Sequence, residues 1–104
     1  MLSLKDSKAL VTGAGTRLGQ SVAVALAREG CDVIVHYSQS RKGAEETVRE
    51  IEALGQKAVA LHADFMLPNA PKELAESALS KFAAVDILVN SASVYPASDK
   101  IAGD

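Results

Sequence analysis

The sequence holds a single cysteine, Cys31, among its 104 residues, and it has no tryptophan. A lone cysteine can form neither a disulfide framework nor a cluster of cysteine metal ligands. No apolar run approaches the ~20 residues that a membrane-spanning helix needs, and residues 1–6 lack the basic-then-apolar order of a signal peptide. These absences predict a cytoplasmic protein without a membrane partner.

The sequence also lacks an excess of charge of one sign. It has 11 Lys and Arg against 13 Asp and Glu, for a formal net charge of -2, so its surface should attract neither nucleic acid nor anionic lipid. The two histidines lie far apart and without carboxylates at metal-binding spacing, so no metal site is predicted. Hydrophobic residues make up 48% of the chain and charged residues 23%, which is typical of one globular domain.

Four short apolar runs alternate with three amphipathic segments along the chain. The runs cover residues 9–11, 33–35, 58–61 and 87–89, and they are continuously apolar, as in a parallel sheet that is covered on both faces. With right-handed crossovers, this β-α-β-α-β-α-β order predicts an α/β fold. It is the N-terminal half of a Rossmann-type doubly wound parallel sheet, with strand order 3-2-1-4.

The three amphipathic segments have apolar side chains at helical spacing. These stripes, which we expect to be buried, are Leu18, Val22, Ala25 and Leu26; Ala44, Val48, Ile51 and Leu54; and Leu74, Ala78, Leu79 and Phe82. Gly30 and Gly55 are predicted to end the first two helices. Asn69, a good N-cap, and Pro71 are predicted to begin the third.

Residues 12–19, Thr-Gly-Ala-Gly-Thr-Arg-Leu-Gly, stand between the first apolar run and the first predicted helix. A strand, a glycine turn and a helix N-terminus form the geometry that binds a pyrophosphate, because free N–H groups and the helix dipole meet there. Gly13 and Gly15 allow a sharp turn and a close approach of the phosphates, and Gly19 allows the helix to pack close to the strand. The cofactor-binding residues expected in this loop are Gly13, Gly15, Thr16, Arg17, Leu18 and Gly19.

The glycines fit T-G-x-x-x-G-x-G with Arg17 in place of the middle glycine, rather than G-x-G-x-x-G. This form resembles the short-chain dehydrogenases/reductases, and within them the pteridine reductase-like branch. His36 and Tyr37, followed by Ser40, resemble the end of the second strand in that branch. Residues 86–93 resemble the family's fourth strand and its N-N-A-G motif, with serine replacing the second Asn and the Gly. The resemblance covers essentially the whole chain, as the N-terminal cofactor-binding half of such an enzyme.

Arg17 has two interpretations. An exposed arginine in the first turn of a helix is slightly unfavourable beside the positive end of the helix dipole. A cation beside a bound pyrophosphate would instead offset its charge and donate hydrogen bonds to it. We favour the second interpretation, and the resemblance implies that Arg17 also borders the substrate pocket.

The end of the second predicted strand indicates the cofactor. NAD-binding sheets place an Asp or Glu there to hold the ribose 2′-hydroxyl, but residues 35–42 contain no acid. Hydroxyls at Ser38 and Ser40, with Arg41 and Lys42 nearby, suit a 2′-phosphate, so NADP(H) is the predicted cofactor. The alternative is that Ser40 caps the next helix and that Arg41 and Lys42 are only solvated.

The resemblance implies cofactor contacts after the third and fourth strands as well. Asp64, which follows Ala63, corresponds to a family aspartate that contacts adenine, although an Asp after a strand is often only a turn residue. Asn90 corresponds to the first asparagine of N-N-A-G, which supports the sheet and lines the cofactor site. The small residues that follow it can lie against the nucleotide ribose: Ser91, Ala92 and Ser93.

The family's proton donor is a Tyr-x-x-x-Lys pair, and Tyr95 does not form one, because Asp99 stands at the i+4 position and Lys100 one residue beyond. The resemblance places the true pair beyond position 104. We therefore expect residues 1–104 to be one dinucleotide-binding domain that ends before the catalytic segment and is inactive alone.

The predicted parent protein is a homo-oligomeric, NADP(H)-dependent oxidoreductase that reduces a pterin-like or other small carbonyl or imine substrate. The alternative is a non-catalytic module that binds or senses a dinucleotide.

Overall fold

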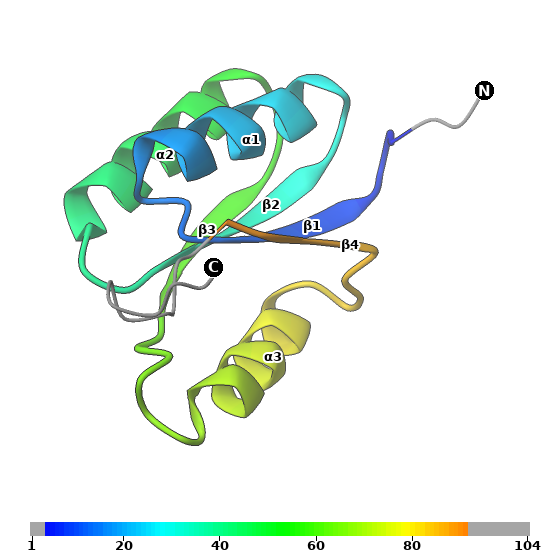
Figure 1. The fold of residues 1–104 in the computed structure, drawn as a ribbon. Helices are drawn as coiled ribbons and strands as arrows, with labels where there is room; N and C mark the ends of the chain where they lie inside the picture. The colour runs from blue at the N-terminus through cyan, green and yellow to red at the C-terminus, as the bar shows by residue number, and fades with distance from the viewer. Residues whose placement is uncertain (1–3, 92–104) are drawn as a thin grey trace.

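The computed structural model describes residues 4–91, and these form a parallel sheet between layers of helices (Figure 1). The elements in chain order are β1 (Lys8–Thr12), α1 (Arg17–Arg28), β2 (Asp32–Tyr37), α2 (Arg41–Ala53), β3 (Ala58–His62), α3 (Ala70–Lys81) and β4 (Ile87–Asn90). All strand pairs are parallel, and the strand order is β3-β2-β1-β4. The predicted Rossmann-type half-fold is confirmed.

The middle residues of the two central strands are apolar because helices cover both faces of the sheet. In Figure 1, α1 and α2 lie on one side of the sheet and α3 on the other. Side chains of a strand alternate between the two faces, so Val11 and Val35 join the core under α1 and α2 while Leu10 and Ile34 join the core over α3. Ile34 is fully buried, and its burial contributes about 1.5–3 kcal/mol.

The predicted helix ends lie where the glycines stand. Gly30 has φ +101° and Gly55 has φ +89°, the left-handed conformation that a glycine just past a helix C-terminus adopts readily. Asn69 does occupy the N-cap position of α3, with Pro71 in the first turn, but its side chain makes no capping hydrogen bond.

Three predicted core leucines and Ala25 are exposed, and for them the prediction was wrong. The exposed fractions are 66% for Leu18, 42% for Leu54 and 53% for Leu79. Leu18 lies in the first turn of α1, and Leu54 is the C-cap residue of α2, so both stand at helix ends rather than over the sheet. In α3 the buried face contains Leu74 and Ala78. Leu79 is the next residue after Ala78, so its side chain points about 100° away from that face.

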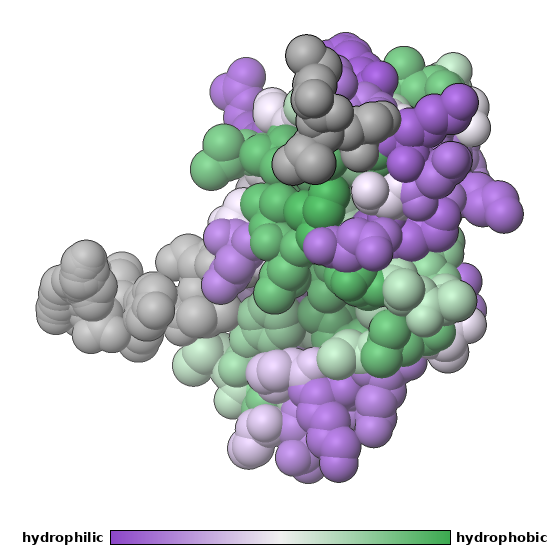
Figure 2. All heavy atoms as spheres, turned by 90° about the vertical axis from the view of Figure 1, so that its right-hand side faces the viewer, coloured by the Kyte–Doolittle hydropathy of each residue, from purple (hydrophilic) through white to green (hydrophobic). Residues whose placement is uncertain are grey.

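β4 is an edge strand of the sheet that residues 4–91 form. It pairs with β1 on one side, and none of the described strands pairs with its other side. Figure 2 shows a band of hydrophobic residues between two hydrophilic zones. Leu88, in the middle of β4, is 65% exposed. An apolar strand with an unpaired edge is a template for another strand.

We therefore expect the 104-residue chain to self-associate in solution, and Leu88→Lys to shift it towards the monomer, because a charge on an edge strand opposes strand pairing. Sedimentation velocity of both proteins measures this. Leu79→Lys, on the exposed face of α3, is the matched control and should leave the wild-type distribution unchanged. A monomeric wild-type chain would contradict the expectation.

Candidate functional site

The candidate site lies at the carboxyl ends of the parallel strands. The chain leaves β1 through α1 to reach β2 on one side of it, while β4 pairs on the other side. In open α/β sheets, such a switch in strand order opens a crevice outside the strand ends, and ligands bind there. The loops after β1, β2 and β3 and the end of β4 meet at this edge and carry the residues singled out in the sequence.

The loop after β1 is packed tightly against the first turn of α1. Gly13 has φ +69°, and a Cβ on Gly19 would lie 2.1 Å from the Gly13 carbonyl oxygen. Thr16 caps the helix, since its hydroxyl donates to the Gly13 carbonyl at 2.7 Å and accepts from the Gly19 N–H at 3.3 Å. Only glycine at 19 allows this approach of the helix to the loop.

Three backbone N–H groups of the loop and helix start remain available. The Gly15, Arg17 and Leu18 amides donate to no group of residues 4–91. They lie at the positive end of α1, and its first turn contains no acidic residue. Together the free amides and the helix dipole are suited to bind an anion, and the exposed Arg17 side chain adds a full positive charge.

The glycine loop is also pressed against the start of α2. A Cβ on Gly15 would lie 2.6 Å from the Ser40 carbonyl oxygen, and one on Gly43 would lie 2.3 Å from the Gly15 carbonyl oxygen. Ser40 is the N-cap residue of α2 but makes no side-chain capping bond. The loops after β1 and β2 therefore form one continuous surface.

Two side chains that the sequence analysis missed hold these loops together. The Gln20 side-chain amide donates to the Gly43 carbonyl at 2.9 Å, and the buried Thr47 hydroxyl contacts the carbonyls of Gly43 at 2.8 Å and Ala14 at 3.2 Å. Thr47 interrupts the charged run of α2 on its buried face, and this was the available signal. Nothing in the sequence distinguishes Gln20 from a solvated glutamine.

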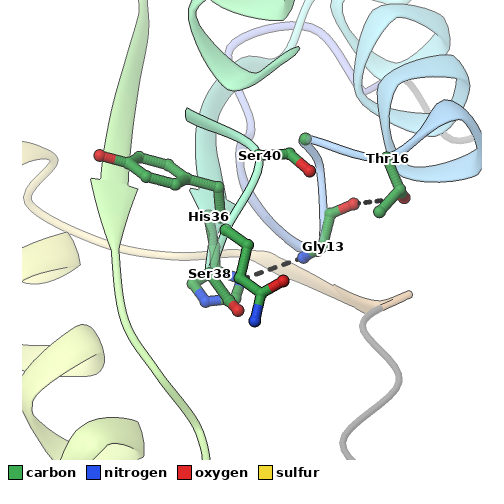
Figure 3. A pocket seen from close by; sticks show the side chains of 8 residues that line it. Gly13, Thr16, His36, Ser38 and Ser40 are labelled. Carbon is green, nitrogen blue, oxygen red and sulfur yellow. Dashed lines mark hydrogen bonds between the residues drawn. The ribbon is translucent and has the colours of Figure 1, made fainter. Parts of the chain in front are cut away.

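His36 lies beneath the glycine loop and is fully buried (Figure 3). Its Nδ1 accepts a hydrogen bond from the Gly13 N–H at 3.0 Å, so Nε2 carries the proton and donates to the Ala63 carbonyl at 2.8 Å. The ring stacks on Phe65 with a centroid distance of 4.5 Å. Burial lowers the pKa of His36; the Ala63 bond opposes this and nearby His62 adds to it. The imidazole is therefore the neutral Nε2–H form.

A pocket of about 170 Å³ opens between the loops after β1 and β2. Its lining brings together seven of the predicted residues and Gln39: Gly13, Gly15, Thr16, His36, Tyr37, Ser38, Gln39 and Ser40. None of these is acidic. Ser38 and Ser40 are exposed to solvent, and Figure 3 shows the side chain of Ser40 beside the loop.

Arg41 does not line this pocket, and neither do Arg17 and Leu18. The Nε of Arg41 lies 3.2 Å from a carboxylate oxygen of Glu45. The Arg41 side chain is 75% exposed, so this ion pair on the helix surface contributes little, and the guanidinium is free to turn towards a ligand.

Asp64 and Asn90 both make structural contacts. The Asp64 carboxylate accepts from the Met66 N–H at 3.0 Å, which is the turn role weighed as the alternative. The Thr12 hydroxyl donates to the Asn90 side-chain oxygen at 2.9 Å and accepts from the Ser91 N–H at 3.1 Å, and the Ser91 hydroxyl donates to the Thr12 carbonyl. These bonds join the ends of β1 and β4. Ala92, Ser93 and Tyr95 lie outside the described residues.

Neither a metal cluster nor a membrane span is found in the described part of the chain. Residues 4–91 place no group of three His, Cys, Asp or Glu side chains where they could hold a metal ion. None of the helices there has the length and apolar character needed to cross a bilayer.

In a comparison with protein families, the family model described as short chain dehydrogenase matches residues 7–102. This match agrees with the glycine loop, the crevice and the strand order described above. The chain belongs to the short-chain dehydrogenase/reductase family. The L-rhamnose 1-dehydrogenase (NAD(P)(+)) of a Sphingomonas species is 38% identical over 96 residues, which are 92% of this chain and 38% of that enzyme.

Two solved structures have the same fold. A putative dehydrogenase from Burkholderia cenocepacia with bound NADP matches with a TM-score of 0.81 and 33% identity, covering 85% of this chain and 34% of that one. A 7α-hydroxysteroid dehydrogenase complexed with NADH matches with a TM-score of 0.79 and 36% identity, again covering 85% and 34%. The chain spans 33–38% of the length of the curated relatives that it matches.

The contact at Gly19 predicts a loss of stability on Gly19→Ala. In an open helix site, alanine would add about 1 kcal/mol over glycine. Here the new methyl group would meet the Gly13 backbone, and overpacking costs about 1–3 kcal/mol. Urea unfolding followed by circular dichroism measures the difference, with Ser21→Ala, on the exposed face of α1, as control. A variant at 19 as stable as the wild type would contradict the packing described.

Proposed function

We propose that this chain is the NADP(H)-binding part of a short-chain reductase that transfers a hydride to a pterin-like or other carbonyl or imine substrate. The observation that carries the proposal is the set of free amides at the start of α1, next to a hydroxyl-lined pocket without an acid. A pyrophosphate needs the first feature, and a 2′-phosphate suits the second.

The proposed roles follow the position of each group. The Gly15 and Leu18 amides, with the Arg17 guanidinium, would hold the pyrophosphate, and Gly13, Thr16 and Gly19 keep the loop in shape. Ser38, Ser40 and Arg41 would hold the 2′-phosphate, beside His36 and Tyr37. Ala63 and Asp64 are proposed at the adenine, and the end of β4 is proposed at the nicotinamide ribose: Asn90, Ser91, Ala92 and Ser93.

The preference for NADP(H) rests on charge at the end of β2. A carboxylate there would accept the 2′-hydroxyl of NAD(H) and repel a 2′-phosphate. Residues 35–42 have no carboxylate, and Arg41 adds a positive charge. Relatives do not decide between the two cofactors, because the three described above carry NAD(P)(+), NADP and NADH in their names.

Bound nicotinamide would supply the hydride, and the residues of this chain would bind and orient the cofactor. Reduction of a carbonyl also needs a proton donor beside the reacting atom. Tyr37 and Tyr95 are the only tyrosines, and neither has a lysine four residues on. We propose that a part of the protein outside these 104 residues supplies the proton donor. The described residues would then bind the cofactor and take no part in the proton transfer.

The same observation supports one alternative, a module that holds or senses a dinucleotide without catalysis. The two candidate functions share every site residue named above. The names of the curated relatives, which are dehydrogenases and reductases, favour the enzyme.

The first test concerns the 2′-phosphate. We expect the chain to bind NADPH more tightly than NADH, and Arg41→Ala to weaken NADPH selectively by about 1–3 kcal/mol, the worth of a charge-assisted hydrogen bond. Isothermal titration calorimetry with both cofactors measures this. Arg49→Ala, an exposed arginine further along α2, is the control and should change neither affinity. Equal affinities, or tighter NADH, would refute the preference.

The second test concerns the pyrophosphate. Arg17→Ala should weaken NADPH and NADH to the same extent, because both cofactors carry this group, and Arg17→Gly should cost less because it restores the common family motif. Arg28→Ala, at the opposite end of α1, is the matched control. Loss of NADPH binding alone in Arg17→Ala would instead place Arg17 at the 2′-phosphate.

A further inference from the structure

We propose that His36 is a positioning residue that makes dinucleotide binding depend on pH, because its neutral ring holds the glycine loop and its protonated ring releases it. The inference rests on the proposed function, since it concerns the loop that would bind the pyrophosphate. His36 itself need not touch the cofactor.

His36 holds two successive amides of the loop. Its ring accepts from the Gly13 N–H at 3.0 Å, and its backbone carbonyl accepts from the Ala14 N–H at 2.8 Å. Both amides are thereby turned towards β2, and the next amide, of Gly15, is free for a ligand. On its other side the ring is tied to the Ala63 carbonyl at 2.8 Å. One buried side chain thus joins the loop after β1 to the end of β3.

Protonation is incompatible with this arrangement. The imidazolium donates from both nitrogens and accepts at neither, so its Nδ1–H would face the Gly13 N–H, donor against donor. The ring is fully buried and stacked on Phe65, so water cannot relieve the conflict while it stays in place. A charged His36 must therefore move, and the start of the loop loses its anchor.

The titratable groups around the ring do not compensate for the added charge. His62, on β3, disfavours protonation of His36. Tyr37, the next residue on β2, packs its ring against His62, and the Asp64 carboxylate is engaged with the Met66 N–H. From β1 and the glycine loop, the groups in contact are the backbone amides described above.

The direction of the pH effect follows from the lowered pKa of His36. Above the ordinary histidine pKa of about 6.5, the ring is neutral in both the folded and the unfolded chain, and its contribution to stability is complete. As pH falls below that value, the unfolded chain takes up the proton more readily than the folded chain, and stability is lost. Affinity for the cofactor should fall at lower pH, as His36 becomes protonated in the folded chain.

The test compares the pH dependence of NADPH binding in the wild-type chain and in His36→Asn. The asparagine Oδ1 can occupy the place of Nδ1 and accept from the Gly13 N–H, but it does not titrate. Between pH 8 and pH 5 we expect the wild type to lose about fivefold to tenfold more affinity than the variant, which corresponds to one lost hydrogen bond.

Taking the difference between the two proteins removes the titration of the 2′-phosphate itself, since a phosphate monoester also titrates near pH 6. His62→Asn is the matched control: it keeps His36, so it should still lose affinity at low pH, with the loss beginning at a slightly higher pH because His62 disfavours protonation of His36. Parallel profiles for wild type and His36→Asn would overturn the proposal.

A second measurement does not need the cofactor. Histidine ¹⁵N NMR of the wild-type chain should show His36 as the Nε2–H form at pH 8, and slow exchange of the Gly13 amide should disappear as His36 becomes protonated. An Nδ1–H form, or slow exchange of the Gly13 amide that persists after His36 is protonated, would overturn the proposal even if His36→Asn fails to fold. If neither NADPH nor NADH binds at pH 8, the proposed function fails, and this measurement still decides the role of His36.

Discussion

The close approach of α1 to the loop after β1 is the constraint on which the rest of the site depends. A Cβ on Gly19 would lie only 2.1 Å from the Gly13 carbonyl oxygen. The backbone of Gly13 therefore already takes up the space that a side chain at position 19 would need. Because the helix begins so near the end of β1, its first amides lie at the carboxyl edge of the sheet, next to the pocket between the loops after β1 and β2. The pairing of β1 with both β2 and β4 then places the other loops around the same point.

Most polar groups at this edge serve to hold backbone in place. Thr16, Thr47, Gln20 and His36 all bond to main-chain groups of the glycine loop or of the start of α2. Thr47 and His36 are fully buried, and buried polar groups are costly unless they are hydrogen-bonded, so these two favour one loop conformation over others. The groups left free are backbone amides and exposed side chains, which a charged ligand can reach.

The family assignment and the geometry account for different parts of the protein's chemistry. The chain belongs to a family of oxidoreductases, and the glycine loop with its free amides is the part of the proposed cofactor site that residues 4–91 display. The matched relatives are about two and a half times as long as this chain. β4 has an unpaired edge and its Leu88 is exposed, although a continuously apolar strand is typical of the interior of a parallel sheet.

The sequence by itself determined the order of the elements, the parallel sheet and the place of the glycine loop, because hydrophobic periodicity and glycine conformation act locally along the chain. It did not determine which leucines are buried, since Leu18, Leu54 and Leu79 are exposed through their positions at helix ends or beside the buried stripe. Only the tertiary structure decided that His36 lies under the loop as a neutral hydrogen-bonded ring and that Gln20 and Thr47 tie the two loops together. Those contacts join residues 23 to 33 positions apart, and no local pattern records which distant carbonyl or amide a buried polar side chain will meet.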